Sequence, residues 1–494
     1  MIYGKEKKLR ISLILFICGI LSLFIGALML IPTGVDFFTG QTQDGEVFLL
    51  CALGVTFCGM AISALSYRNW EEKPSLKEMF VTTSSCWFWV GLISALPFYF
   101  SGQNLSFTDA VFESVSGLTT TGATILANID SMPQGFLIWR AILQWLGGIG
   151  IVILAITVLP ILRIGGMQLF TTESSDSSGK DSPFVTSKLR RFIYVYIVIT
   201  CLCVGALWTA GMSFFDAIAH ALTCVSTGGF STHDLSIAYF KSPTIEWILM
   251  FFMTIGGLPL ALVAAFFDGQ WSKVKNNAQA KTFLGMLVVI ILPISILMWA
   301  LLPQFSSFMN TLRTLAFHVI SIITTTGYVT ENYASWGSFF VLFFFFLLPI
   351  GGCTGSTTGG IKVFRFSILA RTLKRHLTLM VSPHAVIFPR YDDKPVTDDV
   401  MFSVMSFITI FFLTTIICAV GLSLTGLDIV TSLSGTLTAI ANVGPGLGSL
   451  IGPDKSFILL PTLAKWLLAI VMILGRLEFM TIVVLFLPKL WAKN

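Results

Sequence analysis

Four short segments rich in threonine, serine, asparagine and glycine interrupt an otherwise apolar sequence. They read GLTTTGAT (117–124), VSTGGFSTHD (225–234), IITTTGYVT (322–330) and ANVGPGLGS (441–449). Backbone carbonyls and threonine hydroxyls are neutral oxygen donors, and rows of such oxygens can replace the hydration shell of an alkali cation. Glycine reaches backbone dihedral angles that are closed to other residues, so it lets carbonyls aim inward. The chemistry indicated is coordination of a bare monovalent cation.

Three of the four segments align without gaps when one glycine of each is matched. An ionisable residue stands nine positions before that glycine: Glu113 before Gly122, His220 before Gly229, and His318 before Gly327. We interpret these three side chains as filter supports that brace the segments from behind through hydrogen bonds. In the fourth segment the matching glycine is Gly444, and the following Pro445 favours an extended conformation before it.

The composition places the chain in a membrane. Of its 494 residues, 55% are hydrophobic and only 11% are charged, and the mean hydropathy is +0.86. A soluble protein of this length carries about a quarter charged residues. The N-terminus, MIYGKEKKLR, leads into a long apolar stretch without a small-residue cleavage site, so we expect the first helix to remain. The chain is therefore an integral membrane protein.

The apolar stretches define the transmembrane spans. A helix that crosses the hydrocarbon core needs about 20 mostly apolar residues. Ten candidates are 11–31, 48–67, 80–100, 136–159, 192–211, 245–267, 282–302, 338–361, 400–424 and 465–487. Of the 30 lysines and arginines, 24 lie in the two ends of the chain and in alternate connections between the spans. These connections are 68–79, 160–191, 268–281 and 362–395. This asymmetry predicts that both termini are cytoplasmic.

Each threonine–glycine segment follows a stretch too short to cross the bilayer. These stretches are 107–118, 214–225, 309–323 and 426–440. We expect them to form half-helices capped by Asp109, Asp216 and Asp428. Non-helical backbone is tolerated at membrane depth only where protein buries it or where it lines a watery cavity. The pattern predicts an all-α polytopic membrane protein of about ten transmembrane helices, with four pseudo-fourfold helix–pore loop–helix repeats and two extra N-terminal helices.

We place the domain boundaries in the polar connections between these units. Residues 1–79 hold the two extra N-terminal helices. The four pore repeats are 80–165, 190–270, 280–376 and 398–494.

The eighth span ends early and suggests a gate. Its apolar run stops near Ile350, so the glycine-, serine- and threonine-rich stretch 351–360 falls inside the membrane zone. We interpret this stretch as an intramembrane gating loop. Arg476, deep in the last span, costs about 2.5–3.5 kcal/mol on insertion scales, so it is expected to face the loop; a helix-end salt bridge with Glu478 or a neighbour is the alternative. The predicted gate residues are Gly351, Gly352, Thr354, Gly355, Ser356, Thr357, Thr358, Gly359, Gly360 and Arg476.

Four stretches of this chain resemble the Trk/Ktr/HKT superfamily of potassium transporters, in order and spacing over nearly the whole chain. They read FESVSGLTTTGAT, GGFSTHD, GGCTGSTTGG and NVGPGLG. The resemblance implies potassium uptake across the bacterial cytoplasmic (inner) membrane through a single pore. It implies potassium as the transported ligand and a four-strand selectivity filter, with no cofactor in the chain. The filter residues would be Thr120, Thr121, Gly122, Thr227, Gly228, Gly229, Thr325, Thr326, Gly327, Asn442, Val443 and Gly444.

The resemblance also implies partners. These are the lipid bilayer, a second copy of the chain in a homodimer, and a cytoplasmic nucleotide-binding regulatory subunit of the TrkA type. The basic stretch 362–376 is the expected docking surface. The chain contains neither a GxGxxG fingerprint nor a GxxxxGK[ST] loop, so nucleotide control has to come from another polypeptide. No nucleic-acid partner is expected.

Two mechanisms remain open from sequence, a passive potassium channel and a proton- or sodium-coupled symporter. Because the four segments are unequal, strong exclusion of sodium does not follow. An enzyme is disfavoured, since the five histidines show no metal-site spacing and the nine cysteines lie in or beside apolar stretches, as packing residues do. A solute transporter with broken helices would show two inverted halves, whereas this chain has four parallel repeats.

Overall fold

The computed structural model describes residues 9–68, 74–157, 182–385, 387, 389–392 and 394–491. Within these residues the chain is almost entirely helical. Besides the non-helical segments described below, it contains one two-stranded antiparallel pair, β1 (Arg390–Tyr391) and β2 (Lys394–Pro395), and an isolated β-bridge between Ile350 and Ile361. Most of the basic connection 160–191, and the tips of both termini, lie outside the described residues.

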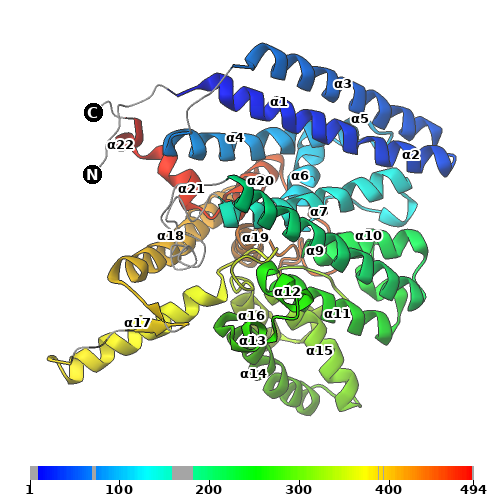
Figure 1. Cartoon of the computed structure of the whole chain (residues 1–494). Coiled ribbons are helices and arrows are strands. Elements are labelled where there is room, and N and C mark those ends of the chain that lie inside the picture. The colour runs from blue at the N-terminus through cyan, green and yellow to red at the C-terminus, as the bar shows by residue number, and fades with distance from the viewer. Residues whose placement is uncertain are drawn as a thin grey trace.

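Three N-terminal helices precede the first repeat: α1 (Ile11–Leu28), α2 (Leu30–Phe38) and α3 (Thr42–Ser66). In Figure 1, α1 and α3 lie side by side along one edge of the molecule. Small residues allow this close packing, because a Cβ on Gly59 would come within 2.9 Å of the Gly19 carbonyl oxygen. Asp36 of α2 accepts a 2.6 Å hydrogen bond from the Gly135 amide, which attaches these helices to the first repeat.

The succession of a long helix, a half-helix, a non-helical segment and a further helix occurs four times. The first succession comprises α4 (Leu76–Ser94), α5 (Leu96–Phe100), α6 (Phe107–Leu118), η1 (Ile129–Ser131) and α7 (Gln134–Thr157). The second comprises α9 (Ser182–Thr209), α10 (Phe214–Val225), η3 (Ser236–Phe240), α11 (Pro243–Gly257) and α12 (Leu260–Phe267), followed by α13 (Trp271–Asn276).

The third and fourth successions complete the chain. The third comprises α14 (Ala278–Leu301), α15 (Phe308–Ile323), η4 (Tyr333–Trp336), α16 (Ser338–Leu347) and α17 (Val363–Val381). The fourth comprises α18 (Asp398–Ser423), α19 (Ile429–Ala441), η5 (Phe457–Leu459), α20 (Thr462–Arg476), α21 (Met480–Val483), η6 (Val484–Phe486) and α22 (Pro488–Trp491). Figure 1 shows α19 near the middle of the molecule and α17 projecting from one side.

The predicted fold class is confirmed, and three of the ten predicted spans are broken. Among the described residues, seven helices are long and apolar enough to cross a membrane, or eight if the bent pair α11–α12 is one span. That pair bends by 107° because Pro259 lacks the amide that would continue the helix. The eighth span stops at Leu347, and the tenth stops at Arg476, where Glu478 and Phe479 take positive φ values.

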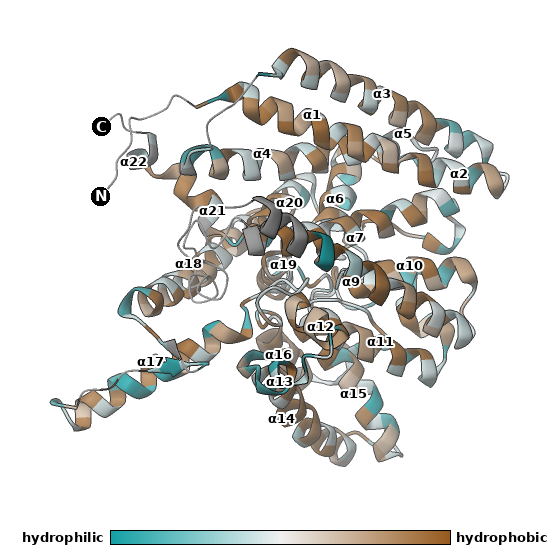
Figure 2. Ribbon diagram, viewed as in Figure 1, coloured by the Kyte–Doolittle hydropathy of each residue, from teal (hydrophilic) through white to brown (hydrophobic). Residues whose placement is uncertain are grey.

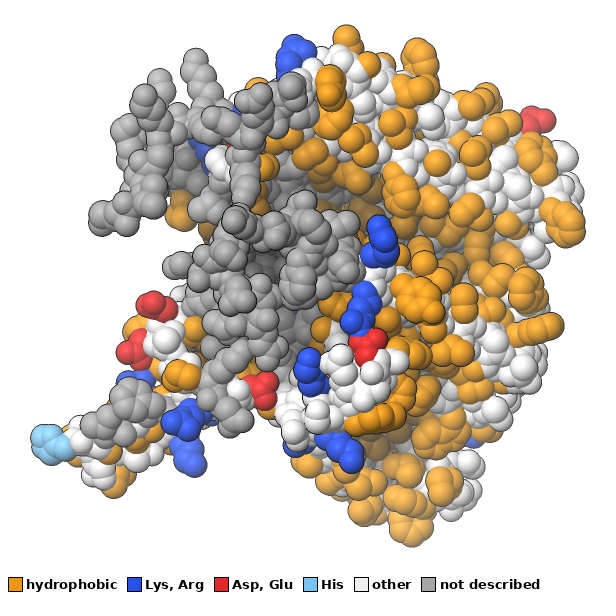
Figure 3. All heavy atoms as spheres, viewed as in Figure 1, with side chains coloured by type: hydrophobic (Ala, Val, Ile, Leu, Met, Phe, Trp, Pro, Cys, Tyr) orange, Lys and Arg blue, Asp and Glu red, His pale blue; other side chains and the backbone are white. Residues whose placement is uncertain are grey.

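The surface is apolar where lipid would contact it. Figure 2 shows apolar residues along α1, α3 and α14, and Figure 3 shows hydrophobic side chains over most of the visible face. On α14, for example, Val289 is 71% exposed. Figure 3 also shows charged side chains gathered near α13 and α17, which carry Lys273, Lys275 and Arg371. This distribution is typical of a polytopic membrane protein.

Candidate functional site

The four half-helices α6, α10, α15 and α19 end immediately before the four threonine–glycine segments. Carbonyl groups at a helix C-terminus carry a partial negative charge of about half an elementary charge, which favours a nearby cation. Asp428 caps α19 by accepting a hydrogen bond from the Thr431 amide at 3.1 Å, as predicted. The same prediction for the two other aspartates is wrong. Serines at the first position of Ser-x-x-Asp sequences cap α6 and α10, and the aspartates follow three residues later.

Each segment repeats the same unusual backbone pattern. Its matched glycine and the residue two positions before it both have positive φ, which is costly for residues other than glycine. The pairs are Thr120 and Gly122 (52° and 77°), Thr227 and Gly229 (54° and 77°), Thr325 and Gly327 (54° and 82°), and Asn442 and Gly444 (55° and 110°). Four segments of unequal sequence therefore share one backbone conformation, which is neither helix nor sheet.

The four segments close into a ring. Each matched glycine lies against a carbonyl oxygen of the next segment, and an added Cβ would overlap that oxygen or come too close to it. The oxygen belongs in each case to the residue just before the matched glycine of that next segment. The successive neighbours are Gly122 and Gly228 O, Gly229 and Thr326 O, Gly327 and Val443 O, and Gly444 and Thr121 O. The order is cyclic, from the first segment through the second, third and fourth and back to the first. Four equivalent carbonyl oxygens are thus gathered at one place, and only glycine fits beside each of them.

The three ionisable residues nine positions before the glycines hydrogen-bond to the backbone or side chains just beyond the ring. Glu113 accepts from the Ile125 amide at 3.0 Å. His220 lies 3.0 Å from the Ser231 hydroxyl, and His318 accepts from the Thr330 and Glu331 amides at 3.3 Å each. Ser434 makes the corresponding hydrogen bond to the fourth segment, because its hydroxyl accepts from the Leu447 amide at 3.1 Å.

Two buried residues of α7 that sequence reasoning missed also contact the segments. Arg140 pairs with Glu113 at 2.8 Å and donates to the Ser231 carbonyl at 2.9 Å. Gln144, one turn later, contacts the second segment. Arg140 lies inside α7 and is only 1% exposed. The i, i+4 spacing of Arg140 and Gln144 places them on one helix face, and that spacing was the available signal.

The stretch 351–360 lies against the ring residues from one side. Gly359 donates to the Thr325 hydroxyl at 2.7 Å, and the Thr227 hydroxyl donates to that of Thr357 at 3.2 Å. Arg476 donates to the Thr357 carbonyl at 2.9 Å and to the Gly147 carbonyl at 3.1 Å. Thr357 and Gly359 of the predicted gate therefore contact the second and third segments, and Arg476 contacts Thr357.

The break between α11 and α12 receives this stretch. Because the helix stops at Gly257, its last carbonyls are free to accept hydrogen bonds from the stretch: Cys353 N donates to Gly257 O at 2.9 Å and Thr357 N to Gly256 O at 3.3 Å. The Leu260 amide donates in return to Gly355 O at 2.9 Å. The sequence prediction treated 245–267 as one straight span and missed this docking site.

Three further charged residues near the stretch are buried. Lys362 lies 3.0 Å from the Thr358 hydroxyl, and Arg365 forms an ion pair with Glu478. The suggested salt bridge between Arg476 and Glu478 is absent among the described ion pairs, because Glu478 faces Arg365 instead. Lys362 and Arg365 were predicted only as part of a cytoplasmic basic surface, yet both are less than 10% exposed.

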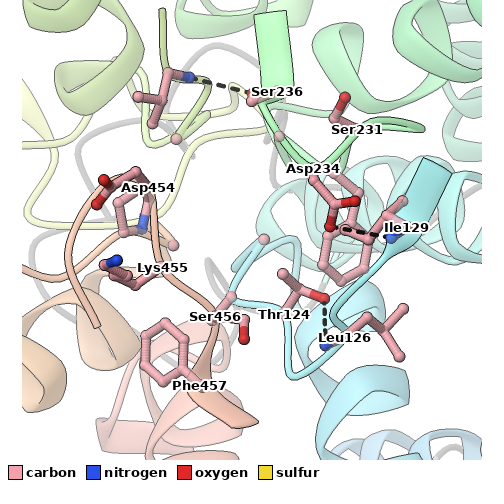
Figure 4. A pocket seen from close by; sticks show the side chains of 18 of the residues that line it. Thr124, Leu126, Ile129, Ser231, Asp234, Ser236, Asp454, Lys455, Ser456 and Phe457 are labelled. Carbon is pink, nitrogen blue, oxygen red and sulfur yellow. Dashed lines mark hydrogen bonds between the residues drawn. The ribbon is translucent and has the colours of Figure 1, made fainter. Parts of the chain in front are cut away.

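On the other side of the ring lies a cavity of about 350 Å³. All four matched glycines line it, together with residues that follow them in the chain. Figure 4 shows Asp454 and Lys455 on one wall and Asp234 on another, where Asp234 accepts a 3.0 Å hydrogen bond from the Ile129 amide. The acidic residues that line this cavity are Asp234 and Asp454.

The fold and the ring together define the class: a polytopic membrane transport protein in which one chain supplies four re-entrant hairpins to a shared centre. Residues 51–493 match the family model described as TrkH, cation transport protein. The chain belongs to this family. The expectation that it is not an enzyme is confirmed by that membership.

Similarity to individual relatives extends over almost the whole chain. It is 42% identical to the Trk system potassium uptake protein TrkI of Halomonas elongata, over 88% of both chains. It is 36% identical to the Trk system potassium uptake protein TrkH of Escherichia coli (strain K12), over 97% of this chain and 98% of that protein. The crystal structure of the potassium transporter TrkH from Vibrio parahaemolyticus superposes with a TM-score of 0.89 at 33% identity, covering 98% of this chain and all of the other.

Proposed function

We propose that this chain takes up potassium across the bacterial cytoplasmic membrane through the carbonyl ring. The observation that carries the proposal is the cyclic contact of four glycines with four carbonyl oxygens of equivalent residues. Neutral oxygens arranged around one point can replace the water of a dehydrated potassium ion without a fixed charge that would trap it. The names of the relatives, which are potassium uptake proteins, support the same cation.

The ion path follows from the two sides of the ring. Potassium enters the 350 Å³ cavity and loses its water at the ring. It then meets the stretch 351–360, which we assign as the gate because it contacts ring residues Thr227 and Thr325. Arg476 holds the gate closed through the Thr357 carbonyl and places a positive charge on the cation path. Conduction therefore requires the stretch to move away from the ring.

The orientation and partners extend the same proposal. The basic segments are cytoplasmic, so the cavity opens to the outside and the gate faces the cytoplasm. Helix α17 begins at Val363, three residues after Gly360, and carries exposed Lys374 and His376, so we assign it as the surface on which a TrkA-type subunit would dock. The homodimer implied by the family resemblance belongs to this proposal, and the mass of the particle in a native lipid nanodisc would test it.

The test uses the purified full chain in liposomes. Rubidium uptake into vesicles loaded with potassium should exceed uptake into protein-free vesicles. Excess external potassium should compete with this uptake. Reversal potentials measured with and without a proton gradient then test passive conduction. A potential that follows the potassium gradient alone supports it, whereas one that moves with pH indicates coupling to protons. Vesicles that contain folded protein with its gate removed and still show no rubidium flux would contradict the proposed function.

A further inference from the structure

The side-chain amide of Gln144 bridges the second ring segment from behind. Its Nε2 donates to the Gly228 carbonyl at 2.6 Å, and its Oε1 accepts from the Phe230 amide at 3.0 Å. The orientation of the amide is fixed, because a carbonyl needs the NH₂ group opposite it and an N–H needs the oxygen. Gln144 has no exposed surface. One side chain therefore holds both neighbours of Gly229.

The carbonyl that Gln144 binds is one of the four ring oxygens. It is the oxygen that lies against Gly122 of the first segment. In the part of the chain that the structure describes, no hydrogen-bond donor contacts the three equivalent ring oxygens, those of Thr121, Thr326 and Val443. The ring is thus unequal: three oxygens have no donor, and the fourth already accepts a short hydrogen bond.

We infer that Gln144 is a specificity-determining residue that biases the ring toward potassium over sodium. This inference rests on the proposed function. An N–H donor on a carbonyl occupies one lone pair and lowers the negative potential that the oxygen presents to an ion. The bridge across Gly229 also prevents the second segment from moving inward around a smaller ion. Sodium is smaller and needs a stronger field to be dehydrated, so both effects disfavour it.

Two substitutions test the inference in the full chain in liposomes, with reversal potentials in opposed potassium and sodium gradients. Gln144→Met has similar length and no hydrogen bond. Gln144→Asn keeps the amide but is one methylene shorter, so it cannot span from Gly228 to Phe230. Since one hydrogen bond contributes about a factor of five, the permeability ratio of potassium over sodium should fall about fivefold in each variant.

Gln279→Met is the matched control. Gln279 is also buried, and its Oε1 accepts from the Thr354 amide of the gate at 2.9 Å rather than from the ring. This variant should change the rate of flux and keep the wild-type permeability ratio. A wild-type ratio in a conducting Gln144→Met or Gln144→Asn variant, or an equal fall in the Gln279→Met variant, would overturn the inference. A folded chain with its gate removed that conducts no potassium would overturn the proposed function instead.

Discussion

At the scale of single residues, the ring glycines combine two requirements. Gly327 has φ of 82°, and an added Cβ would overlap the Val443 carbonyl oxygen and approach Pro445. A left-handed conformation costs another residue about 1–2 kcal/mol, and the overlap adds to that cost. Thr325, two residues earlier, also has positive φ, and its hydroxyl accepts a hydrogen bond from the Gly359 amide. The need for glycine therefore lies in the neighbouring carbonyl as much as in the dihedral angle.

We predict that Gly327→Ala lowers rubidium flux about tenfold and reduces the preference for potassium over sodium, because the added methyl group displaces the Val443 carbonyl from the ring. If this displacement weakens ion binding by about 1.4 kcal/mol, the effect is a factor of ten. The measurement is rubidium uptake into liposomes with competing sodium. Gly337→Ala is the control, because Gly337 also has positive φ, 117°, but an added Cβ there meets nothing within 4 Å. Equal effects of the two substitutions would show that backbone strain alone is responsible.

A second residue-scale feature is the contact of His233 with carboxylates of two repeats. Its Nδ1 lies 2.5 Å from Asp130 and its Nε2 lies 3.5 Å from Asp216, while the ring of Tyr239 stacks on it. Partial burial lowers the pKa of His233, but the Asp216 carboxylate nearby and the hydrogen bond to Asp130 outweigh burial and raise the pKa above its usual value. The cation is thus favoured in the folded protein.

The contribution of His233 to stability depends on pH. Because the folded pKa is raised, this stabilisation is fully present below the unfolded pKa of about 6.5 and is lost as pH rises through the folded value. We predict that His233→Ala lowers the thermal unfolding midpoint more at pH about 6 than at pH about 9. The exposed His376 provides the control variant. A decrease that is the same at both pH values would contradict this assignment.

The residue types of the site were predictable, and several partners were not. The glycine register and the positions of Glu113, His220 and His318 follow from counting along the sequence. Arg140 and Gln144 were missed because the sequence alone does not show which neighbouring element a polar residue in an apolar helix faces. Their partners Glu113 and Gly228 lie 27 and 84 residues away in the chain. Contacts of that separation depend on how the repeats pack.

At the scale of elements, the broken helices place the proposed gate. Helix α11 ends at Gly257 and α16 ends at Leu347, and the backbone groups released by the α11–α12 break bond to the stretch 351–360. The short eighth span was predictable, because an apolar run of a dozen residues cannot cross the bilayer. The 107° bend was not predicted, because we read the proline in GGLP as part of a continuous apolar span.

The gate assignment makes a prediction at this scale. Deleting residues 354–356 shortens the stretch and removes its contact with Gln279 and α12, so basal rubidium flux in liposomes without any partner protein should rise at least several-fold. Selectivity should stay at the wild-type ratio, because the deletion leaves the ring residues in place. Flux that is unchanged, in protein that is still folded by thermal melting, would argue against a gating role for this stretch.

At the scale of the whole molecule, four unequal sequences converge on one centre. The all-helical membrane fold was predictable from composition and from the four half-helices. The cyclic order of the segments was not visible in the sequence, because it depends on the packing of α6, α10, α15 and α19 around a common point. Unequal repeats also allow unequal partners, such as Gln144, which hydrogen-bonds to the second segment, and Arg476 beside the gate.

Orientation is a whole-molecule prediction. In a background without the nine native cysteines, Lys455→Cys in the cavity wall should react with a membrane-impermeant maleimide in intact cells. Lys374→Cys on α17 should react only after permeabilisation, because the basic segments are cytoplasmic. The opposite pattern of labelling would invert the proposed topology and would place the gate outside.

The central claim concerns the ring itself, and the most direct measurement is the anomalous scattering of rubidium in crystals of the full chain grown with a rubidium salt. A peak is predicted at the centre of the oxygens of Thr121, Gly228, Thr326 and Val443, and it should weaken when potassium replaces rubidium. Absence of a peak there, with the four segments in the arrangement described, would contradict the claim that these carbonyls replace the water of the transported cation.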